Sequence, residues 1–276
     1  MTIKAFKSII FHRYTLNVRL FLKKNFYPVY FANKPLANKH KYITLYNRLI
    51  KKKLYYLKYI KKNLTNFDIN FIKKLALITV VTIKKTPLYY EHGFLLATEL
   101  TKYIKTNKIK KINILETGTA RGYSSIIMSY ILDKYKVKGK IITIDIIPND
   151  IKIFWNSIID TDNRKKSRRE LLANYKKYQK KILFENNNSE IYLKNNKKRY
   201  NFVFLDGAHD YQTVKNEYSF ISKYQKKNDV IFFDDVTKKY FPGIVKLINE
   251  IQKIKNYKVK LFKLNKNIGY ALLIKN

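Results

Sequence analysis

From residue 111 to the C-terminus, short apolar runs alternate with amphipathic stretches, and this alternation restricts the fold more than any other feature. The runs with strand character span residues 112–115, 140–146, 181–184, 201–205 and 230–233, each followed by residues of helical spacing. Two last runs, 258–264 and 270–274, predict a terminal hairpin around residues 267–269. Continuous apolar strands that alternate with helices are typical of a parallel sheet covered on both faces, so the sequence predicts a doubly wound α/β domain.

The composition excludes several other classes of protein. The chain has no Cys, which excludes disulfide scaffolds, zinc knuckles, Cys nucleophiles and iron–sulfur clusters. A hydrophobic content of 46% is too high for a disordered polycation. The apolar stretch Leu75–Ile83 is too short for a membrane span, and the first residues do not form an apolar signal segment. These features predict a cytoplasmic protein without a transmembrane segment.

The formal net charge of +39 comes from 58 basic and 19 acidic residues. Most of the basic residues are Lys, and Lys, Asn, Ile, Tyr and Phe are all abundant, which indicates a bias toward A/T-rich codons. Arg, the preferred reader of bases and phosphates, is scarce. We therefore interpret the diffuse Lys content as a solvated surface, which argues against nucleic acid as the default partner.

The charge is concentrated in residues 1–85, where Asp68 is the single acid. Leu49, Leu54, Leu57 and Ile60 recur near helical spacing, so this segment is expected to be a basic, mainly helical extension ahead of a domain at 86–276. Two interpretations are open. In the favoured one, the extension packs on the domain; in the other, it anchors an acidic partner such as anionic lipid, nucleic acid or acidic glycan.

Acidic residues gather at or just past the ends of the expected strands. They are Glu116, Asp145, Asp206, Asp234 and Asp235. Ligands of open α/β sheets bind outside the carboxyl ends of the strands, so these acids predict a site at that edge. Glycine, of which the chain has only 7, follows the same pattern, since two glycines fall in the first turn and one follows Asp206. Such backbones need positive φ or a close ligand approach.

The first turn reads Glu116-Thr-Gly118-Thr-Ala-Arg-Gly122-Tyr-Ser124, which fits neither the dinucleotide G-x-G-x-x-G pattern nor a P-loop. Its E-x-G-x-x-x-G spacing between strand and helix resembles motif I of class I S-adenosylmethionine-dependent methyltransferases. The resemblance implies that the glycines approach the methionine part of the cofactor and that Asp145 binds the ribose hydroxyls. The cofactor-binding residues it implies are Glu116, Gly118, Thr119, Gly122, Ser124, Asp145, Asn188 and Ser189.

One stretch departs from that pattern. Relatives carry Gly-Asp-Ser or similar after the third strand, where an acid or its neighbour meets the adenine. This chain has Asn186-Asn-Asn188-Ser189 instead. The Gly is missing, while Asn188 keeps the ability to hydrogen-bond an adenine edge.

Further stretches extend the resemblance over about residues 86–276. Residues 87–93, 204–211 and 233–236 are similar to the catechol-type and macrocin-type O-methyltransferases, a group often labelled methyltransferase family 24. This resemblance implies a seven-stranded sheet in the order 3-2-1-4-5-7-6, with the last-but-one strand antiparallel. In metal-dependent members, acids at the positions of Asp206, Asp234 and Asp235 bind a divalent cation, and oxygen ligands suit Mg²⁺. The alternatives are that Asp235 caps the next turn and that Asp206 binds substrate without metal.

The general base of catechol-type members stands three residues after the acid of the fourth strand, and here that residue is His209. An imidazole is suited to take a proton from a hydroxyl, so His209 and Asp206 are the candidate catalytic residues. The alternative is a capping or supporting histidine. A long insert at residues 148–180 is expected to form a substrate lid. Its Arg164–Arg169 segment suggests either an anionic or sugar-phosphate substrate or a solvated helix.

Together these features predict an enzyme that methylates an oxygen of a sugar, glycoside or other small hydroxylated acceptor, with S-adenosylmethionine and a possible role for Mg²⁺. A homo-oligomer is compatible with the sequence. The alternative within enzymes is a nucleic-acid methyltransferase, or a nucleic-acid-binding protein that uses the extension. Against this alternative, the chain lacks the Asn/Asp-Pro-Pro-Tyr signature of exocyclic amine methylation. A third hypothesis is a non-catalytic binding module. The presence of Glu116, Asp145 and Asp206 together argues against it.

Overall fold

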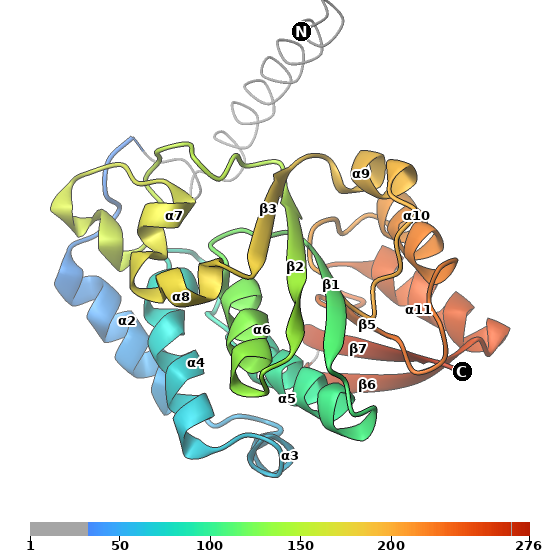
Figure 1. The fold of residues 1–276 in the computed structure, drawn as a ribbon. Coiled ribbons are helices and arrows are strands. Elements are labelled where there is room, and N and C mark those ends of the chain that lie inside the picture. Colours follow the sequence, from blue (N-terminus) through green and yellow to red (C-terminus); the bar gives the residue numbers. More distant parts are fainter. Residues whose placement is uncertain (1–32, 266) are drawn as a thin grey trace, which may run out of the picture.

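A computed structural model describes residues 33–265 and 267–276. Its centre is a seven-stranded sheet in the order β3-β2-β1-β4-β5-β7-β6 (Figure 1). The strands are β1 Lys111–Thr117, β2 Lys138–Asp145, β3 Ile182–Asn186, β4 Phe202–Leu205, β5 Val230–Phe233, β6 Tyr257–Asn265 and β7 Ile268–Lys275. β7 runs antiparallel to both β5 and β6, and the other neighbouring pairs are parallel. The expected doubly wound sheet, its strand order and its terminal hairpin are confirmed.

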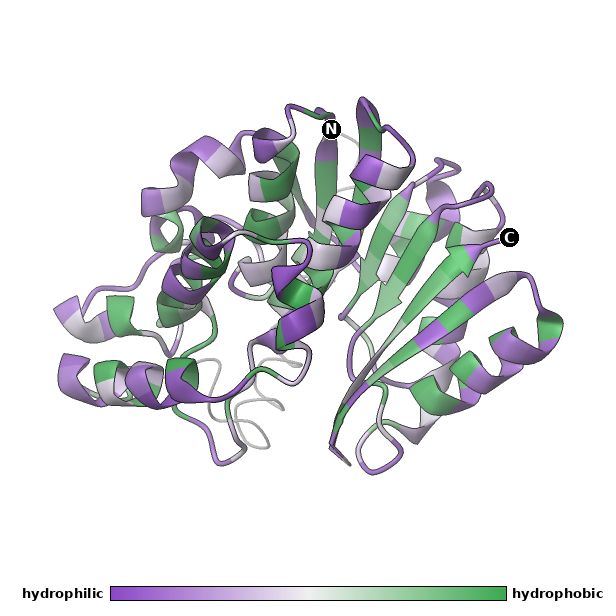
Figure 2. Cartoon of the chain, turned by 90° about the horizontal axis from the view of Figure 1, so that it is seen from below, coloured by the Kyte–Doolittle hydropathy of each residue, from purple (hydrophilic) through white to green (hydrophobic). Residues whose placement is uncertain are grey.

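Helices cover both faces of this sheet (Figure 1). One face is covered by α4 Asn66–Thr79, α5 Glu91–Thr106 and α6 Tyr123–Lys134, and the other by α9 Ser189–Asn195, α10 Tyr211–Ser222 and α11 Pro242–Ile254. Alternation along β4 explains this division, because Phe202 and Phe204 join the first hydrophobic cluster whereas Val203 and Leu205 join the second. The strands are accordingly rich in hydrophobic residues, and the helices turn hydrophilic residues outward (Figure 2).

The described part of the N-terminal segment is helical, with α2 Lys39–Lys51 and α3 Leu57–Lys61 ahead of α4. Leu49, Leu54 and Ile60, from the predicted helical pattern, are buried in the same cluster as α5 and α6. The helices therefore share a hydrophobic core with the sheet domain, and the division at residue 85 stays a prediction. Residues 1–32 of the expected extension lie outside the described residues.

Asp68, the single acid of this segment, fastens α4 to α6. It caps its own helix by accepting from the backbone N of Thr65 at 2.7 Å. Across the helix pair it accepts from the Tyr130 hydroxyl and from Lys134 Nζ, each at 2.5 Å. The carboxylate is completely buried. Burial by itself would raise the pKa of Asp68, but the hydrogen bonds from Lys134, Tyr130 and Thr65 outweigh burial and lower it.

Replacing Asp68 with Asn should lower the free energy of unfolding by about 2–3 kcal/mol, because buried donors lose a charged acceptor. The matched control is Asp133→Asn, which removes the more exposed Asp133–Lys177 ion pair from α6 and should cost less than about 1 kcal/mol. Urea unfolding at neutral pH measures both values. Since the folded pKa of Asp68 is lowered, its stabilisation is present above the unfolded pKa and is lost as the pH falls through the folded pKa. Equal losses for the two variants would contradict this role.

The insert after β2 is built from short helices. They are η1 Ile158–Asp162, α7 Arg168–Leu171, η2 Ala173–Tyr175 and α8 Lys176–Gln179. Its Trp155 is buried, and the indole donates to the Lys166 carbonyl at 2.7 Å. The function of the insert as a lid stays a prediction. Among the helices of the described residues, none has the length and apolar character needed to cross a membrane.

Candidate active site

The turn between β1 and α6 is shaped by two glycines in the left-handed region, Gly118 with φ 87° and Gly122 with φ 82°. A Cβ on Gly118 would lie 2.2 Å from the carbonyl oxygen of Asp206, so the position excludes any side chain. Gly207 also lies close to this turn, because a Cβ at residue 207 would lie 3.2 Å from the backbone N of Gly118. The turn therefore packs directly on the backbone that follows β4.

Glu116 lies beneath this turn and is completely buried. Its carboxylate accepts hydrogen bonds from the hydroxyls of Ser124 and Ser125 and, at 2.5 Å, from Thr143 on β2. Burial raises the pKa of Glu116 to about 7, although these hydroxyl donors oppose the shift. Thr119 reaches the same strand, with its hydroxyl 2.6 Å from that of Thr143. In the structure, Glu116, Thr119 and Ser124 therefore hold the turn in place against β2.

Asp145 is the last residue of β2 and lies next to the same turn. It accepts from the backbone N of Ala120 at 2.8 Å and from that of Ile147 at 2.9 Å. Its third donor was not expected from the sequence, since Arg168 of the insert donates from Nη2 at 3.0 Å. Three donors on one carboxylate fix its orientation next to the glycine turn.

Arg168 is almost completely buried, with 1% of its surface exposed. Besides Asp145 it binds the carbonyl oxygen of Ala120 from Nε at 2.8 Å, and its guanidinium lies 5.5 Å from the ring of Trp155. One sequence signal could have found it. In a chain whose composition so strongly favours Lys, an Arg marks a place where the planar, bidentate guanidinium is needed.

The sequence left two interpretations of Arg164–Arg169 open, namely contact with an anionic or sugar-phosphate substrate and a solvated helix. Arg164 pairs with Asp162 at 3.0 Å, and Arg168 pairs with Asp145. Both guanidinium groups therefore bind carboxylates of this chain. Neither interpretation of the sequence included these carboxylate partners within the chain.

The predicted adenine-binding stretch lies beside the end of β2. Asn186 donates from Nδ2 to the carbonyl oxygens of Asp145 and Ile146. Asn188 caps α9, because its Oδ1 accepts from the backbone N of Glu190 at 3.0 Å, and Ser189 is the first residue of that helix. The structure thus places Asn188 and Ser189 next to the Asp145 strand end, and their contact with adenine stays a prediction.

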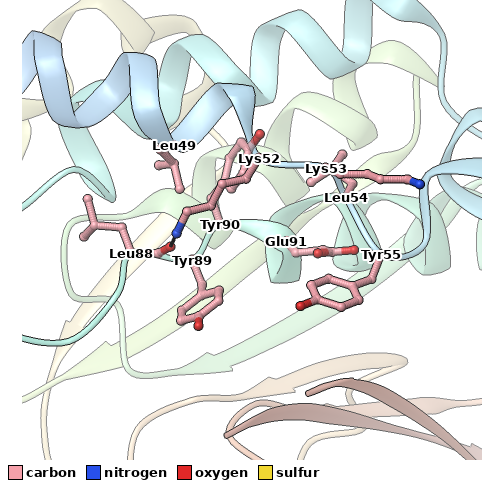
Figure 3. A pocket seen from close by; sticks show the side chains of 9 residues that line it. All are labelled: Leu49, Lys52, Lys53, Leu54, Tyr55, Leu88, Tyr89, Tyr90 and Glu91. Carbon is pink, nitrogen blue, oxygen red and sulfur yellow. Dashed lines mark hydrogen bonds between the residues drawn. The ribbon is translucent and has the colours of Figure 1, made fainter. Parts of the chain in front are cut away.

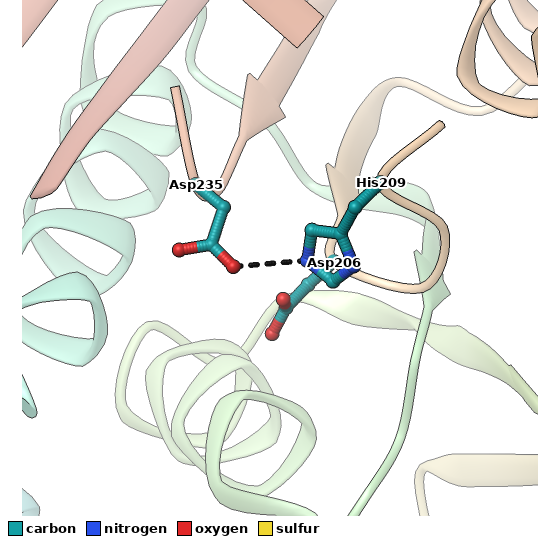
Figure 4. A group of neighbouring side chains, drawn as sticks. All are labelled: Asp206, His209 and Asp235. Carbon is teal, nitrogen blue, oxygen red and sulfur yellow. Dashed lines mark ion pairs between the residues drawn. The ribbon is translucent and has the colours of Figure 1, made fainter. Parts of the chain in front are cut away.

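Three side chains converge where β4 and β5 end, and Figure 4 shows them facing one another. Asp206 and His209 follow β4, Asp235 follows β5, and one ligand atom from each lies within 4.8 Å of the others. His209 Nε2 is 2.9 Å from Asp235 Oδ2, and its ring stacks on Phe241 with centroids 4.3 Å apart. We refer to Asp206, His209 and Asp235 as the acidic cluster. It combines hard oxygen donors with a nitrogen that can carry a proton.

The cluster differs from the expected trio of Asp206, Asp234 and Asp235. Among the described residues, His209 takes the third position, and Asp234 instead accepts the backbone N of Asp235 on its Oδ1 at 2.7 Å. The offset of His209 from Asp206 was evident in the sequence. Its pairing with Asp235 was not, because that contact joins two different strand ends.

The carboxylates repel one another. Burial raises the pKa of Asp206, and the negative charges of Asp234 and Asp235 raise it further. Burial and the charge of Asp235 likewise raise the pKa of Asp234. A proton or a bound cation would relieve this repulsion, so the site favours a positively charged occupant.

Comparisons with known proteins agree with this geometry. Residues 115–236, which run from β1 past Asp235, match the family model Methyltransf_24, described as a methyltransferase domain. This part of the chain is therefore similar to methyltransferase domains. The match includes every candidate residue named above for the turn, the strand ends and the acidic cluster. No curated protein matches the chain in sequence.

Solved methyltransferases have a similar fold. The O-methyltransferase from Bacillus cereus in complex with SAH is 15% identical, with a TM-score of 0.50 over 77% of this chain and 92% of that chain. The O-methyltransferase TomG from Streptomyces achromogenes, in complex with SAM, is 15% identical, with a TM-score of 0.50 over 77% and 96%. SAH-bound PaMTH1 from Podospora anserina is 15% identical, with a TM-score of 0.51 over 79% and 93%. At such low identity, these similarities establish the methyltransferase fold alone.

Proposed function

We propose that the methyltransferase domain transfers the methyl group of S-adenosylmethionine to an oxygen of a small hydroxylated acceptor such as a sugar, a glycoside or a phenol. One observation carries this proposal. The Gly118 turn packs on the backbone of Asp206, so the predicted cofactor turn and the acidic cluster meet at the carboxyl ends of β1 and β4. A methyl donor and an acceptor hydroxyl bound there would be neighbours.

The cofactor would span three strand ends. Its methionine carboxylate would lie at the glycine turn, where the N-terminus of α6 favours negative charge. Its ribose hydroxyls would reach Asp145, and its adenine would lie beside Asn188 and Ser189. The cofactor products named with the B. cereus and P. anserina structures support the same choice of cofactor.

The chemistry is an in-line displacement. The acceptor oxygen forms a bond to the methyl carbon while the carbon–sulfur bond breaks, and the electron pair leaves with S-adenosylhomocysteine. His209 would take the hydroxyl proton, and Asp235, 2.9 Å from its Nε2, would orient the ring and stabilise the imidazolium. The remaining work is alignment of the two substrates, which is an entropic contribution.

A divalent cation also fits the acidic cluster. Asp206 and Asp235 would supply oxygen ligands, and His209 or a reoriented Asp234 would supply a third. The raised pKa values of Asp206 and Asp234 indicate excess negative charge that such an ion would neutralise. When bound, the ion would act as a Lewis acid that lowers the pKa of the acceptor hydroxyl.

Chelation tests the cation separately from the cofactor. Treatment with EDTA should lower turnover at least tenfold, and added Mg²⁺ should restore it. The affinity for S-adenosylhomocysteine, measured by calorimetry, should stay unchanged. The reason is that the turn and Asp145 are separate from the cluster ligands. Mg²⁺ should also raise the melting temperature of wild type but not of Asp235→Asn. Full turnover after chelation would remove the metal and leave His209 as the base.

The reaction itself is tested by release of S-adenosylhomocysteine from S-adenosylmethionine with pooled sugars, sugar nucleotides and phenols. Release that depends on one of these pools supports the proposal. Release that depends only on added RNA or DNA, with salt-sensitive binding, would replace it with nucleic-acid methylation.

A further inference from the structure

A cavity of about 660 Å³ lies between the α2–α3 connection and the segment that leads into α5 (Figure 3). Its walls include Lys52, Lys53, Leu54 and Tyr55 on one side and Tyr89 and Glu91 on the other. This volume is in the range of pockets that hold small organic molecules. One wall belongs to the N-terminal helices and the other precedes the methyltransferase match, so neither segment forms the cavity by itself.

Specific hydrogen bonds hold the two walls together. Lys52 Nζ donates to the carbonyl oxygen of Leu88 at 3.1 Å. The backbone N of Tyr56 donates to Glu91 Oε1 at 3.0 Å. Both bonds join the α2–α3 connection to the segment before α5, so the cavity is a defined feature of the packing.

The lining carries the positive charges of Lys52 and Lys53. No carboxylate of the described residues lies within ion-pair distance of Lys52 or Lys53. Glu91, the single acid of the lining, is 4% exposed, and its Oε1 already accepts from the backbone N of Tyr56. Lys52 Nζ also lies 5.1 Å from the centroid of the Tyr89 ring. Aromatic walls with ammonium groups that form no ion pair among the described residues suit a ring-bearing anion.

One wall of the cavity is connected to the strand that leads to the acidic cluster. His92 directly follows Glu91, and its ring stacks 6.4 Å from that of Phe204, two residues before Asp206. The segment that lines the cavity thus continues directly into a residue that contacts the strand leading to Asp206.

We propose that this cavity binds the anionic end of a ring-bearing acceptor and that Lys52 and Lys53 determine the preference for an acid group. The inference rests on the proposed function, which it extends by a class of substrate. It also assigns a role to the basic N-terminal segment, whose α2–α3 connection supplies both lysines. A neutral acceptor of the same shape would lose the contacts to the two ammonium groups.

Fluorescence titration of the full chain with anilinonaphthalene sulfonate, an aromatic anion, tests the cavity without turnover. Lys52→Gln and Lys53→Gln should each weaken binding about fivefold, the effect of a partly exposed ion pair. Lys52→Arg should stay within about twofold of wild type, since it keeps the charge. Lys58→Gln, an exposed lysine of α3 outside the lining, is the matched control and should bind as wild type does.

Phenylnaphthylamine, the uncharged analogue of the probe, separates charge from shape. Its affinity should be the same in wild type and in the Lys52→Gln/Lys53→Gln double variant. Undiminished sulfonate binding in the double variant, or equal loss for both probes, would overturn the proposed charge recognition. Unchanged melting temperatures would show that all variants remain folded.

Kinetics connect the cavity to the reaction. With an acceptor from the pools, anilinonaphthalene sulfonate should raise the KM for the acceptor and leave kcat unchanged, and the double variant should show the same change. Absence of competition would overturn the assignment to the acceptor. S-Adenosylhomocysteine binding is measured independently, so failure of the methyltransferase proposal is distinguishable from failure of the cavity proposal.

Discussion

Replacing His209 with Ala is expected to lower kcat by about 10²–10⁴, the usual contribution of a general base. The imidazole is placed for this role between Asp206 and Asp235, with Nε2 2.9 Å from Asp235 Oδ2. Cofactor affinity should not change, because His209 lies outside the glycine turn and the Asp145 strand end. The measurement is S-adenosylhomocysteine release at saturating acceptor, together with calorimetric titration of the cofactor product.

Three further variants make this result specific. His40→Ala, on the exposed surface of α2, is the matched control and should have wild-type kcat. Asp235→Asn should lower kcat as well, and the double variant should be little worse than His209→Ala if the pair acts as a unit. Near-normal kcat in His209→Ala with metal still bound would instead make the cation alone responsible for activating the hydroxyl.

Replacing Asp145 with Ala should weaken S-adenosylmethionine binding about 10- to 100-fold. A hydrogen bond to a charged group contributes about 1.5–3 kcal/mol, and the ribose would lose at least one such bond. Calorimetry of wild type and variant measures the change. Asp150→Ala, which changes an exposed acid of the insert that follows β2, should leave the affinity unchanged.

The ion pair with Arg168 complicates the interpretation of Asp145→Ala, so a second variant of Asp145 is needed. It is 1% exposed, so the loss of Asp145 leaves a buried guanidinium without its carboxylate and should also lower the melting temperature. Asp145→Asn keeps an acceptor for Arg168 while removing the charge, so it should lose cofactor affinity with a smaller loss of stability. Unchanged affinity in both variants would refute the assignment of the ribose to Asp145.

Local sequence patterns were sufficient to predict the sheet and the acidic residues at its edge. The apolar run before Glu116 and the apolar run before Asp206 each predict a strand, and parallel strands bring their ends to one edge. The strand-end acids could therefore be placed from the sequence. The left-handed conformation of Gly118 and Gly122 also follows from their positions in a tight turn between strand and helix.

Contacts between distant segments could not be derived in this way. Asp68 binds Lys134, 66 residues further along the chain, and periodicity places each on a helix without pairing the helices. Arg168 reaches Asp145 only because the insert folds back over the end of β2. His209 and Asp235 meet although they follow different strands, and Asp235 adopts φ 55° after β5. Such a conformation is uncommon for a non-glycine residue, and no local sequence pattern marks it here.

The crystal structure of the full chain with S-adenosylhomocysteine tests the central claim most directly. We expect one bound molecule, with its ribose hydroxyls within hydrogen-bond distance of Asp145 and its amino-acid end at the Gly118–Gly122 turn. Its sulfur should face the acidic cluster of Asp206, His209 and Asp235. A cofactor product bound elsewhere, or no binding at concentrations that saturate a methyltransferase, would contradict the account.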